Sequence, residues 1–285
     1  MQAIERVGVI GAGTMGNGIA QACAIAGVDV VMVDVAQAAV ERGVATIDAS
    51  LTRLQKKDKI TADARTAALA RIAGTTDYSA LAGTQLIIEA ATESVDLKLR
   101  ILKQLDALAR ADAVLASNTS SISITALATA TSHPERFVGM HFFNPVPVMA
   151  LVEIIRGLQT SDATVAAVRA FAERLGKTPI FVKNSPGFVV NRILCPMINE
   201  AIFVFAEGLA SAEDIDNGMR LGCNHPIGPL ALADMIGLDV MLAVMNVFYG
   251  DFNDPKYRPA PLLKEMVAAG YLGRKTKRGF YHYDT

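Results

Sequence analysis

The stretch Gly11-Ala12-Gly13-Thr14-Met15-Gly16 decides the fold, because it joins a predicted strand at residues 6–10 to a helix rich in small residues. A second apolar strand follows at 28–33 and ends at Asp34. In such a strand–turn–helix unit the glycines allow a tight turn, close approach of the backbone to a pyrophosphate, and close packing of helix on strand. The helix start offers N–H groups to phosphates, and an acidic residue about 20 positions later accepts hydrogen bonds from a ribose 2′-hydroxyl. The stretch therefore predicts a dinucleotide site rather than a structural turn, and Asp34, which would repel a 2′-phosphate, favours NAD(H) over NADP(H).

The composition favours a protein with a large apolar core. Hydrophobic residues make up 52% of the 285 positions, the mean hydropathy is +0.33, and the net charge is −1. No uncharged apolar run reaches the roughly 18 residues that a membrane span needs, and no basic stripe suggests a nucleic acid. A parallel sheet buried on both faces and a subunit interface would explain the apolar excess, so neither a membrane nor a nucleic acid is an expected partner.

The chain start and the cysteines indicate the compartment. The first predicted strand begins a few residues after Met1, which leaves no room for a signal or transit peptide. Cys23, Cys195 and Cys223 are scattered among apolar residues and have no metal-ligand spacing. We expect buried, reduced thiols, no metal site and a cytoplasmic location.

Strand-like and helix-like segments alternate as far as residue 184. After Asp34, apolar residues at 40, 44, 47, 51 and 54 form one face of a helix, and a second helix at 61–72 is expected to return alongside it. The two would make a helical hairpin at about 36–73 with a basic tip. Further strands are expected at 86–90, 113–117, 136–143, 151–155 and 178–182, and further helices at 97–108 and 163–175.

The pattern becomes helical after residue 184. Ser185 is a suitable N-cap, and Pro186 suits the first turn of a long helix that would reach Glu207. Another helix is predicted at 211–221. We therefore predict an α/β domain at 1–184, a doubly wound Rossmann-type sheet that binds NAD, followed by a smaller all-α domain at 185–285. The second domain is expected to close over the substrate and to form the interface of a homodimer.

Polar groups stand at the carboxyl ends of predicted strands, where open α/β sheets bind ligands. They are Glu93, the cluster Ser117–Ser121, and His141. His141 and Glu153 are lone ionisable groups in consecutive apolar strands, and each is costly to bury without a partner. If His141 and Glu153 contact each other, neither is buried without a partner. A carboxylate on one imidazole nitrogen also raises the basicity of the other, as a general base requires. The alternative is that His141 bonds backbone while Glu153 faces solvent at a sheet edge.

Three other features each have a functional and a structural interpretation. Ser120 could contact substrate, or Ser120 or Ser121 could cap a helix beginning near Ile122. Asn191 could contact a ligand or could be an ordinary exposed amide. The basic tip at 53–59 could meet the phosphates of a long substrate or could be a solvated face.

Six segments share one order with a known family: Gly11-Ala12-Gly13-Thr14-Met15-Gly16, Ala116-Ser117-Asn118-Thr119-Ser120-Ser121, His141-Phe142-Phe143-Asn144-Pro145-Val146-Pro147, Leu151-Val152-Glu153-Ile154, Pro186-Gly187-Phe188-Val189-Val190-Asn191-Arg192 and Gly279-Phe280-Tyr281. Together they closely resemble the short-chain L-3-hydroxyacyl-CoA dehydrogenase family, over essentially the whole chain. The segments that begin at His141 and Pro186 are specific well beyond a generic dinucleotide-binding match. One departure is Thr276-Lys277-Arg278-Gly279, where Thr-Gly-x-Gly is commoner, and nothing catalytic is expected there.

The resemblance implies roles for the catalytic and substrate-binding residues. His141 would be the catalytic base and Glu153 its partner. Ser120 and Asn191 would hydrogen-bond the 3-oxygen of the substrate or hold its acyl chain, with Asn144 supporting the site.

The resemblance also implies binding roles for charged and loop residues. Arg53 and Lys57 lie where the helical hairpin of the family meets CoA phosphates. The positions that match cofactor contacts are Gly11, Gly13, Thr14, Met15, Gly16, Asp34, Glu93, Lys98, Asn118, Ser120 and Asn144.

The implied activity is reversible, NAD-dependent oxidation of a short-chain (S)-3-hydroxyacyl-CoA, such as 3-hydroxybutyryl-CoA, to the 3-oxoacyl-CoA. One alternative is a dehydrogenase of a free 3-hydroxy acid or sugar acid, which would have no use for Arg53 and Lys57. Another is a catalytically silent NAD-binding protein, although such a protein need not keep all four catalytic residues named above. We expect a self-standing enzyme rather than a piece of a multifunctional β-oxidation enzyme.

Overall fold

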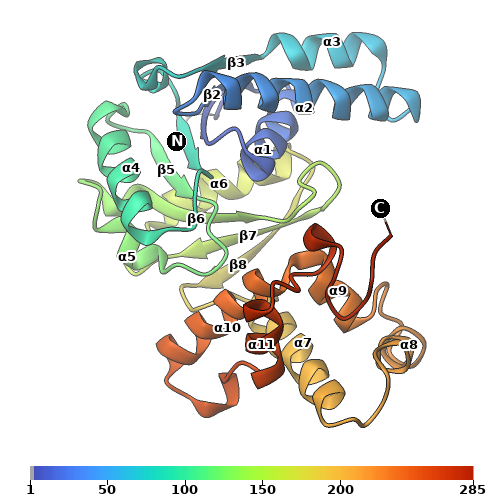
Figure 1. Ribbon diagram of the computed structural model, residues 1–285. Helices are drawn as coiled ribbons and strands as arrows, with labels where there is room; N and C mark the ends of the chain where they lie inside the picture. Colours follow the sequence, from blue (N-terminus) through green and yellow to red (C-terminus); the bar gives the residue numbers. More distant parts are fainter. Residues whose placement is uncertain (1–2, 285) are drawn as a thin grey trace. The chain divides into compact units, whose positions relative to one another are not determined.

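The computed structural model describes residues 3–284, which form two compact units along the chain (Figure 1). The first ends at Ser185 and the second begins at Pro186. A mostly parallel sheet with helices makes up the first unit, and helices make up the second. The predicted fold class, a Rossmann-type α/β sheet followed by a helical domain, is confirmed.

One eight-stranded sheet forms the centre of the first unit. Its strands lie in the order β3-β2-β1-β4-β5-β6-β7-β8, and the first six follow the doubly wound order of dinucleotide-binding domains. Neighbouring strands are parallel except β6 and β7, which are antiparallel. The strands are β1 (Arg6–Ile10), β2 (Asp29–Val33), β3 (Ile72–Thr75), β4 (Leu86–Glu89), β5 (Val114–Ser117), β6 (Phe137–Phe142), β7 (Leu151–Arg156) and β8 (Thr178–Lys183).

Apolar side chains are buried on both faces of the central strands. Val7 and Val9 of β1 belong to a core that also contains Ile19 of α1 and Val168 of α6. Ile10, which points to the opposite face from Val9, is equally buried. This two-sided burial explains the apolar excess of the sequence. The helices of the unit are α1 (Thr14–Ile25), α2 (Gln37–Lys56), α3 (Ala62–Ala70), α4 (Val95–Leu108), α5 (Ile124–Ala128) and α6 (Asp162–Arg174), with short 3-10 turns η1 (Tyr78–Leu81) and η2 (Pro134–Arg136).

The helical hairpin is present as α2 and α3, but its second helix is shorter than predicted. The helix expected at 61–72 ends at Ala70, and Ile72 instead begins the edge strand β3. This strand pairs in parallel with β2, with Val30 opposite Ile72. The prediction was wrong there because pairing with a neighbouring strand, which the local pattern does not contain, decides the conformation of a short segment.

Helices α7 to α11 surround a separate core in the second unit. Ile198 and Ile202 of α7 pack in one cluster with Leu230 of α9 and Phe248 of α10. The predicted helix at 211–221 is confirmed as α8, whose N-cap Ser211 accepts a hydrogen bond from the backbone N–H three residues on. The helices are α7 (Val190–Ala206), α8 (Ala212–Gly222), α9 (Pro229–Ile236), α10 (Leu238–Phe252) and α11 (Pro261–Ala268), with 3-10 turns η3 (Pro255–Tyr257) and η4 (Arg274–Thr276).

The first helix of this unit begins later than the sequence predicts. We expected Ser185 to cap it and Pro186 to lie in its first turn, but α7 begins at Val190. Gly187 and Phe188 take φ values of +71° and +52°, which are incompatible with a right-handed helix. Residues 186–189 therefore form a turn that precedes the helix.

The C-terminal departure from the family pattern has a conformational consequence. Lys277, at the position where the resemblance implies a commoner glycine, takes a φ of +58°. A lysine pays a steric cost in this left-handed region that glycine avoids. Asp234 of α9 anchors the segment that follows Lys277. Its carboxylate accepts hydrogen bonds from the N–H groups of Phe280 and Tyr281 and from the Tyr283 hydroxyl.

Two of the three cysteines match the expectation and one does not. Cys23 and Cys195 are free and buried, and burial raises the pKa of each thiol to about 12. Cys223 is free but exposed, because it follows the last turn of α8. The expectation of burial for Cys223 was therefore wrong.

Among residues 3–284, no single helix is long and apolar enough to cross a membrane, although α9 and α10 pass that test when taken together, with a 97° bend between them.

Candidate active site

The glycine stretch forms the loop between β1 and α1 together with the first turn of α1, and it lines an open cavity of about 360 Å³. Gly11 has a φ of +96°, and a Cβ placed on it would lie 2.7 Å from the Cα of Ala91. A Cβ on Gly16 would lie 1.7 Å from the carbonyl oxygen of Gly11. Both positions therefore need glycine to keep the turn closed against the end of β4. The cavity is lined by Gly11, Ala12, Gly13, Thr14, Asn17, Asp34, Ala39, Arg42, Gly43, Thr46 and Ala91.

Gly13 leaves room beside this loop. A Cβ built on it would meet nothing within 4 Å, so the missing side chain leaves space that a pyrophosphate can fill. Gly13 is also the N-cap of α1, and no side chain caps that helix end. The first N–H groups of α1 are thus available to an anion, and the residues of the loop fit a dinucleotide.

Asp34 brings a negative charge to the same cavity. Its Oδ2 accepts a hydrogen bond from the N–H of Ala12 at 2.8 Å, so the carboxylate also braces the glycine loop. The pKa of Tyr78 is raised, first by burial and then by the negative charges of Asp34 and Glu89. Arg42 lines the cavity as well, and sequence reasoning missed it because an exposed arginine on an amphipathic helix carries no signal of its own.

Glu93 connects the loop after β4 to the loop after β5. Its Oε1 accepts three hydrogen bonds, from the Ser120 N–H at 2.7 Å, the Ser120 hydroxyl at 2.9 Å and the Thr119 hydroxyl at 2.7 Å. The N-cap of α5 is Ser123, whose Oγ accepts from the helix backbone. The alternative in which Ser120 or Ser121 caps this helix is therefore wrong.

His141 and Glu153 lie directly opposite each other on the antiparallel strands β6 and β7. The Nδ1 of His141 is 2.7 Å from the Oε2 of Glu153. Both residues are buried, with 6% and 0% of their surface exposed. Because β7 lies between β6 and β8, the alternative in which Glu153 faces solvent at a sheet edge is wrong. The ring of Phe143 lies 4.4 Å from the imidazole, centroid to centroid.

The turn after β6 is held by two polar side chains. Asn118 accepts a hydrogen bond at 2.8 Å from the backbone of β6, and so ties the loop after β5 to that strand. Asn144 is exposed and precedes Pro145 through a cis peptide bond. The Nζ of Lys177 donates to two carbonyl oxygens of the same turn at 2.5 and 2.8 Å, and burial lowers the pKa of this lysine. Sequence reasoning missed Lys177, which lies about 30 residues from the turn it holds.

Lys98 lies in a buried cluster. Its Nζ is 2.5 Å from the Oε2 of Glu89, 3.3 Å from the Oγ of Ser117 and 3.6 Å from the Oε2 of Glu93. The side chain of Lys98 has no exposed surface. Its connection to the loops after β4 and β5 therefore runs through Glu93. Glu89 was also missed, although a charged residue at the end of an apolar strand was a signal that could have found it.

The remaining residues predicted to bind substrate belong to other elements. Arg53 lies in the last turn of α2, and Lys57 is the C-cap of that helix. Both side chains are exposed at the tip of the hairpin. Asn191 belongs to the second unit, in the first turn of α7.

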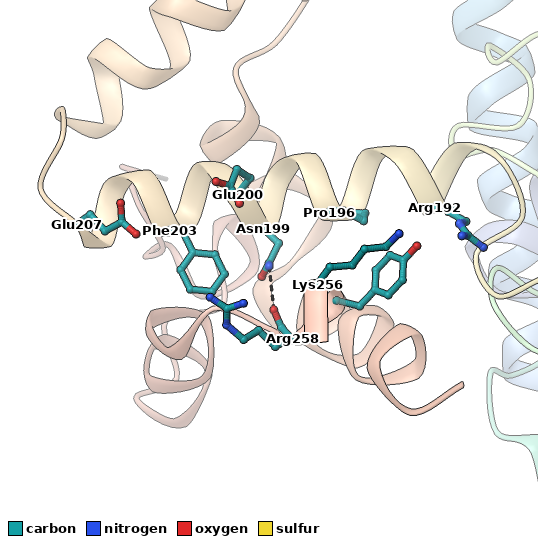
Figure 2. A pocket seen from close by; sticks show the side chains of 9 residues that line it. Arg192, Pro196, Asn199, Glu200, Phe203, Glu207, Lys256 and Arg258 are labelled. Atoms are coloured by element: carbon teal, nitrogen blue, oxygen red, sulfur yellow. Dashed lines mark hydrogen bonds between the residues drawn. The ribbon is translucent and has the colours of Figure 1, made fainter. Parts of the chain in front are cut away.

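A different pocket, of about 400 Å³, lies within the second unit along α7 (Figure 2). Figure 2 shows Glu200 on α7 and Glu207 at the C-cap of that helix, with Lys256 and Arg258 coming from the segment after α10. The guanidinium carbon of Arg258 lies 5.0 Å from the ring centroid of Phe203. The lining combines three cations with two carboxylates and contains no residue predicted for the site, so the cavity at the glycine loop is the stronger candidate.

Comparisons with known proteins identify the same two units. The family model for the NAD binding domain of 3-hydroxyacyl-CoA dehydrogenase matches residues 6–185, and the model for the C-terminal domain of that family matches residues 187–283. A crystal structure of (S)-3-hydroxybutyryl-CoA dehydrogenase PaaH1 from Ralstonia eutropha is 68% identical, with a TM-score of 0.97, and the match covers 99% of this chain and 100% of that one.

Curated relatives agree with this match. The 3-hydroxybutyryl-CoA dehydrogenase of Bradyrhizobium diazoefficiens is 52% identical over 98% of this chain and 96% of its own length. A probable 3-hydroxybutyryl-CoA dehydrogenase of Deinococcus radiodurans is 54% identical over 98% of this chain and all of its own. The first unit is thus the NAD-binding domain of an oxidoreductase, and the chain belongs to the 3-hydroxyacyl-CoA dehydrogenase family.

Proposed function

We propose that the protein catalyses the reversible, NAD-dependent oxidation of a short-chain (S)-3-hydroxyacyl-CoA to the 3-oxoacyl-CoA. The observation that carries the proposal is the buried pair of His141 and Glu153 near the carboxyl end of β6, with Nδ1 2.7 Å from Oε2. The names of the relatives from Ralstonia and Bradyrhizobium support 3-hydroxybutyryl-CoA and acetoacetyl-CoA as the first substrate pair to test.

In the proposed mechanism His141 is the general base. Glu153 accepts the hydrogen bond from Nδ1–H, which makes Nε2 the nitrogen that removes the proton of the 3-hydroxyl group. Bound NAD⁺ supplies the hydride acceptor. Glu153 stabilises the imidazolium that results without itself taking the proton. In the reductive direction the imidazolium returns its proton to the 3-oxygen.

Ser120, Asn144 and Asn191 are proposed to orient the 3-oxygen and the acyl group. The Ser120 hydroxyl donates to Glu93 at 2.9 Å, and a hydroxyl oxygen also carries acceptor lone pairs. To donate to a 3-oxo group, the hydroxyl has to rotate away from Glu93. Such donors stabilise the negative charge that develops on the oxygen during reduction.

The cofactor and CoA contacts are proposed on separate elements. The pyrophosphate would lie on the loop of residues 11–13 and the start of α1, where Gly13 leaves open space, and the adenosine ribose would meet Asp34. Glu93 and Asn118 would complete the cofactor side of the site. Arg53 and Lys57 would meet CoA phosphates at the tip of the hairpin.

The test of the proposal is NADH oxidation with acetoacetyl-CoA, measured beside acetoacetate and beside NADPH. We expect turnover with acetoacetyl-CoA and NADH. His141→Gln should lower turnover roughly 10²- to 10⁴-fold, the usual contribution of a general base, and should leave NADH affinity unchanged.

The matched control is His133→Gln, because His133 is an exposed histidine in the same unit, ahead of the start of β6. It should turn over like the wild type. Near-normal turnover of His141→Gln would rule out the base assignment. Turnover of acetoacetate in place of acetoacetyl-CoA would keep the hydride chemistry and discard the CoA assignment.

A further inference from the structure

Glu89 is a fully buried carboxylate at the end of β4 for which the proposed mechanism has no use. Its Oε2 accepts hydrogen bonds from the ammonium group of Lys98 at 2.5 Å and from the hydroxyl of Ser117 at 2.8 Å. The three side chains come from β4, α4 and β5. A buried ion pair often contributes little net stability compared with apolar residues of the same volume, so stability alone does not account for this one.

The other oxygen of Glu89 holds the wall of the cofactor cavity. Oε1 accepts a hydrogen bond from the N–H of Ala91 at 2.9 Å. Ala91 lines the glycine-loop cavity, and its Cα is the atom that a Cβ on Gly11 would meet at 2.7 Å. One carboxylate therefore fixes the backbone against which the glycine loop closes.

Lys98 extends this connection to the loop after β5. Its Nζ is 3.6 Å from the Oε2 of Glu93, whose Oε1 holds both the N–H and the hydroxyl of Ser120. The contacts run without interruption from Ala91 through Glu89, Lys98 and Glu93 to Ser120.

We propose that Glu89 is a positioning residue for cofactor binding, which sets the Ala91 wall through one oxygen and the Glu93 carboxylate through Lys98. The inference rests on the proposed function for the roles of Glu93 and Ser120. Because Glu89 is fully buried, its proposed effect passes through Ala91 and Lys98. Its effect is to keep two loops, which follow different strands, in the spacing that one dinucleotide requires.

The experiment measures NADH affinity by fluorescence and the thermal unfolding midpoint for Glu89→Gln. The amide keeps an acceptor for Ala91 but leaves the ammonium group of Lys98 without its closest carboxylate. We expect the dissociation constant for NADH to rise about tenfold, the equivalent of one charge-assisted hydrogen bond, and the midpoint to fall.

The control for a structural effect is Thr160→Val. Thr160 is buried, and its hydroxyl donates to the Phe137 carbonyl at the opposite end of the sheet. This variant should lower the midpoint and leave NADH affinity unchanged. Wild-type affinity in Glu89→Gln, or an equal loss of affinity in Thr160→Val, would overturn the proposal.

The double variant Glu89→Gln/Lys98→Met keeps the proposal testable if the single variant does not fold. It removes both buried charges, so the unfolding midpoint should recover. NADH affinity should stay low, because Glu93 has lost Lys98. Recovery of NADH affinity together with the midpoint would mean that the pair serves packing only, and would overturn the proposal.

NADH binding needs no acyl-CoA, so the two proposals fail in different ways. A wild-type protein that binds NADH but does not reduce acetoacetyl-CoA would contradict the proposed substrate. The NADH affinities of Glu89→Gln and Thr160→Val would still test the role of Glu89 in that case.

Discussion

Gly13, the N-cap of α1, and Gly16, in the first turn of that helix, differ in what a methyl group would meet. At Gly16 the added carbon would overlap the Gly11 carbonyl, at 1.7 Å, whereas at Gly13 it would enter open space. Gly16 therefore serves the fold, and Gly13 serves a ligand that approaches the backbone.

This difference predicts opposite behaviour for two alanine variants. Gly13→Ala should keep the wild-type unfolding midpoint and lose NADH affinity by about tenfold or more, because the methyl group fills the space for the pyrophosphate. Gly16→Ala should be destabilised by roughly 1–3 kcal/mol, the usual cost of overpacking, and should lose affinity with it. Thermal unfolding and NADH fluorescence measure the two effects.

Gly218→Ala provides the matched control. Gly218 lies within α8 in the second unit, where a Cβ meets nothing within 4 Å. Alanine is a better helix former than glycine by about 0.5–1 kcal/mol, so this variant should be at least as stable as the wild type and should bind NADH normally. Unchanged NADH affinity in Gly13→Ala would contradict the loop assignment.

At the residue scale, the pairing of ionisable side chains that stand alone in apolar strands could be predicted from the sequence. His141 and Glu153 each stand alone in an apolar run, and burial without a partner would be costly for both. The cluster of Lys98, Glu89 and Ser117 could not be assembled in this way, because its members come from three elements separated by up to 28 positions. A lysine in an amphipathic helix is normally exposed, so nothing in the pattern indicated that Lys98 is buried.

At the element scale, the segments with a long apolar period could be predicted, and the short ones could not. Three elements have a hydrophobic pattern that is complete within their own sequence: the strand at 6–10, the helix after it and the hairpin helix α2. Strand β3 forms only because β2 lies beside it. The start of α7 is set by the positive φ angles of Gly187 and Phe188, which a good capping sequence at Ser185 does not reveal.

The hairpin tip gives the prediction that belongs to this scale. Arg53 and Lys57 are exposed at the end of α2. Arg53→Ala/Lys57→Ala should raise the KM for acetoacetyl-CoA about tenfold through lost phosphate contacts, with kcat and NADH affinity unchanged. The difference from the wild type should shrink at high salt, which screens exposed charges.

A charge-matched variant separates a phosphate site from general attraction. Lys103→Ala/Lys264→Ala removes two exposed cations, one from α4 and one from α11. It should leave the KM near the wild-type value. If both double variants raised the KM equally, the tip would be no more than a solvated basic face.

At the scale of the whole molecule, the second unit carries large apolar side chains on its surface. Ile193, Leu209 and Leu221 are 67%, 75% and 82% exposed. Contiguous exposed apolar patches mark interaction surfaces, and closed two-fold dimers are the commonest assemblies. We propose a homodimer formed through this unit.

Light scattering tests the dimer directly. The expected mass is twice the 30.2 kDa of one chain. Ile193→Glu/Leu221→Glu should shift the protein toward the monomer, because the interface would have to bury two charges. Leu158→Glu, at an 85% exposed position of the first unit, should remain dimeric. A wild-type protein of single-chain mass at micromolar concentration would refute the proposal.

The antiparallel ladder between β6 and β7 makes the acid–base pair depend on strand register. His141 faces Glu153 because the two residues are ladder partners, and a slip of one residue would send one of the pair to the other face of the sheet. The connection at 143–150 is itself held in place, because the Nζ of Lys177 donates to the carbonyl oxygens of Val146 and Met149. An insertion or deletion there would disturb these bonds and the position of Asn144, whereas the register of the two strands would be kept by their own ladder. A single residue inserted within either strand would separate the pair at once.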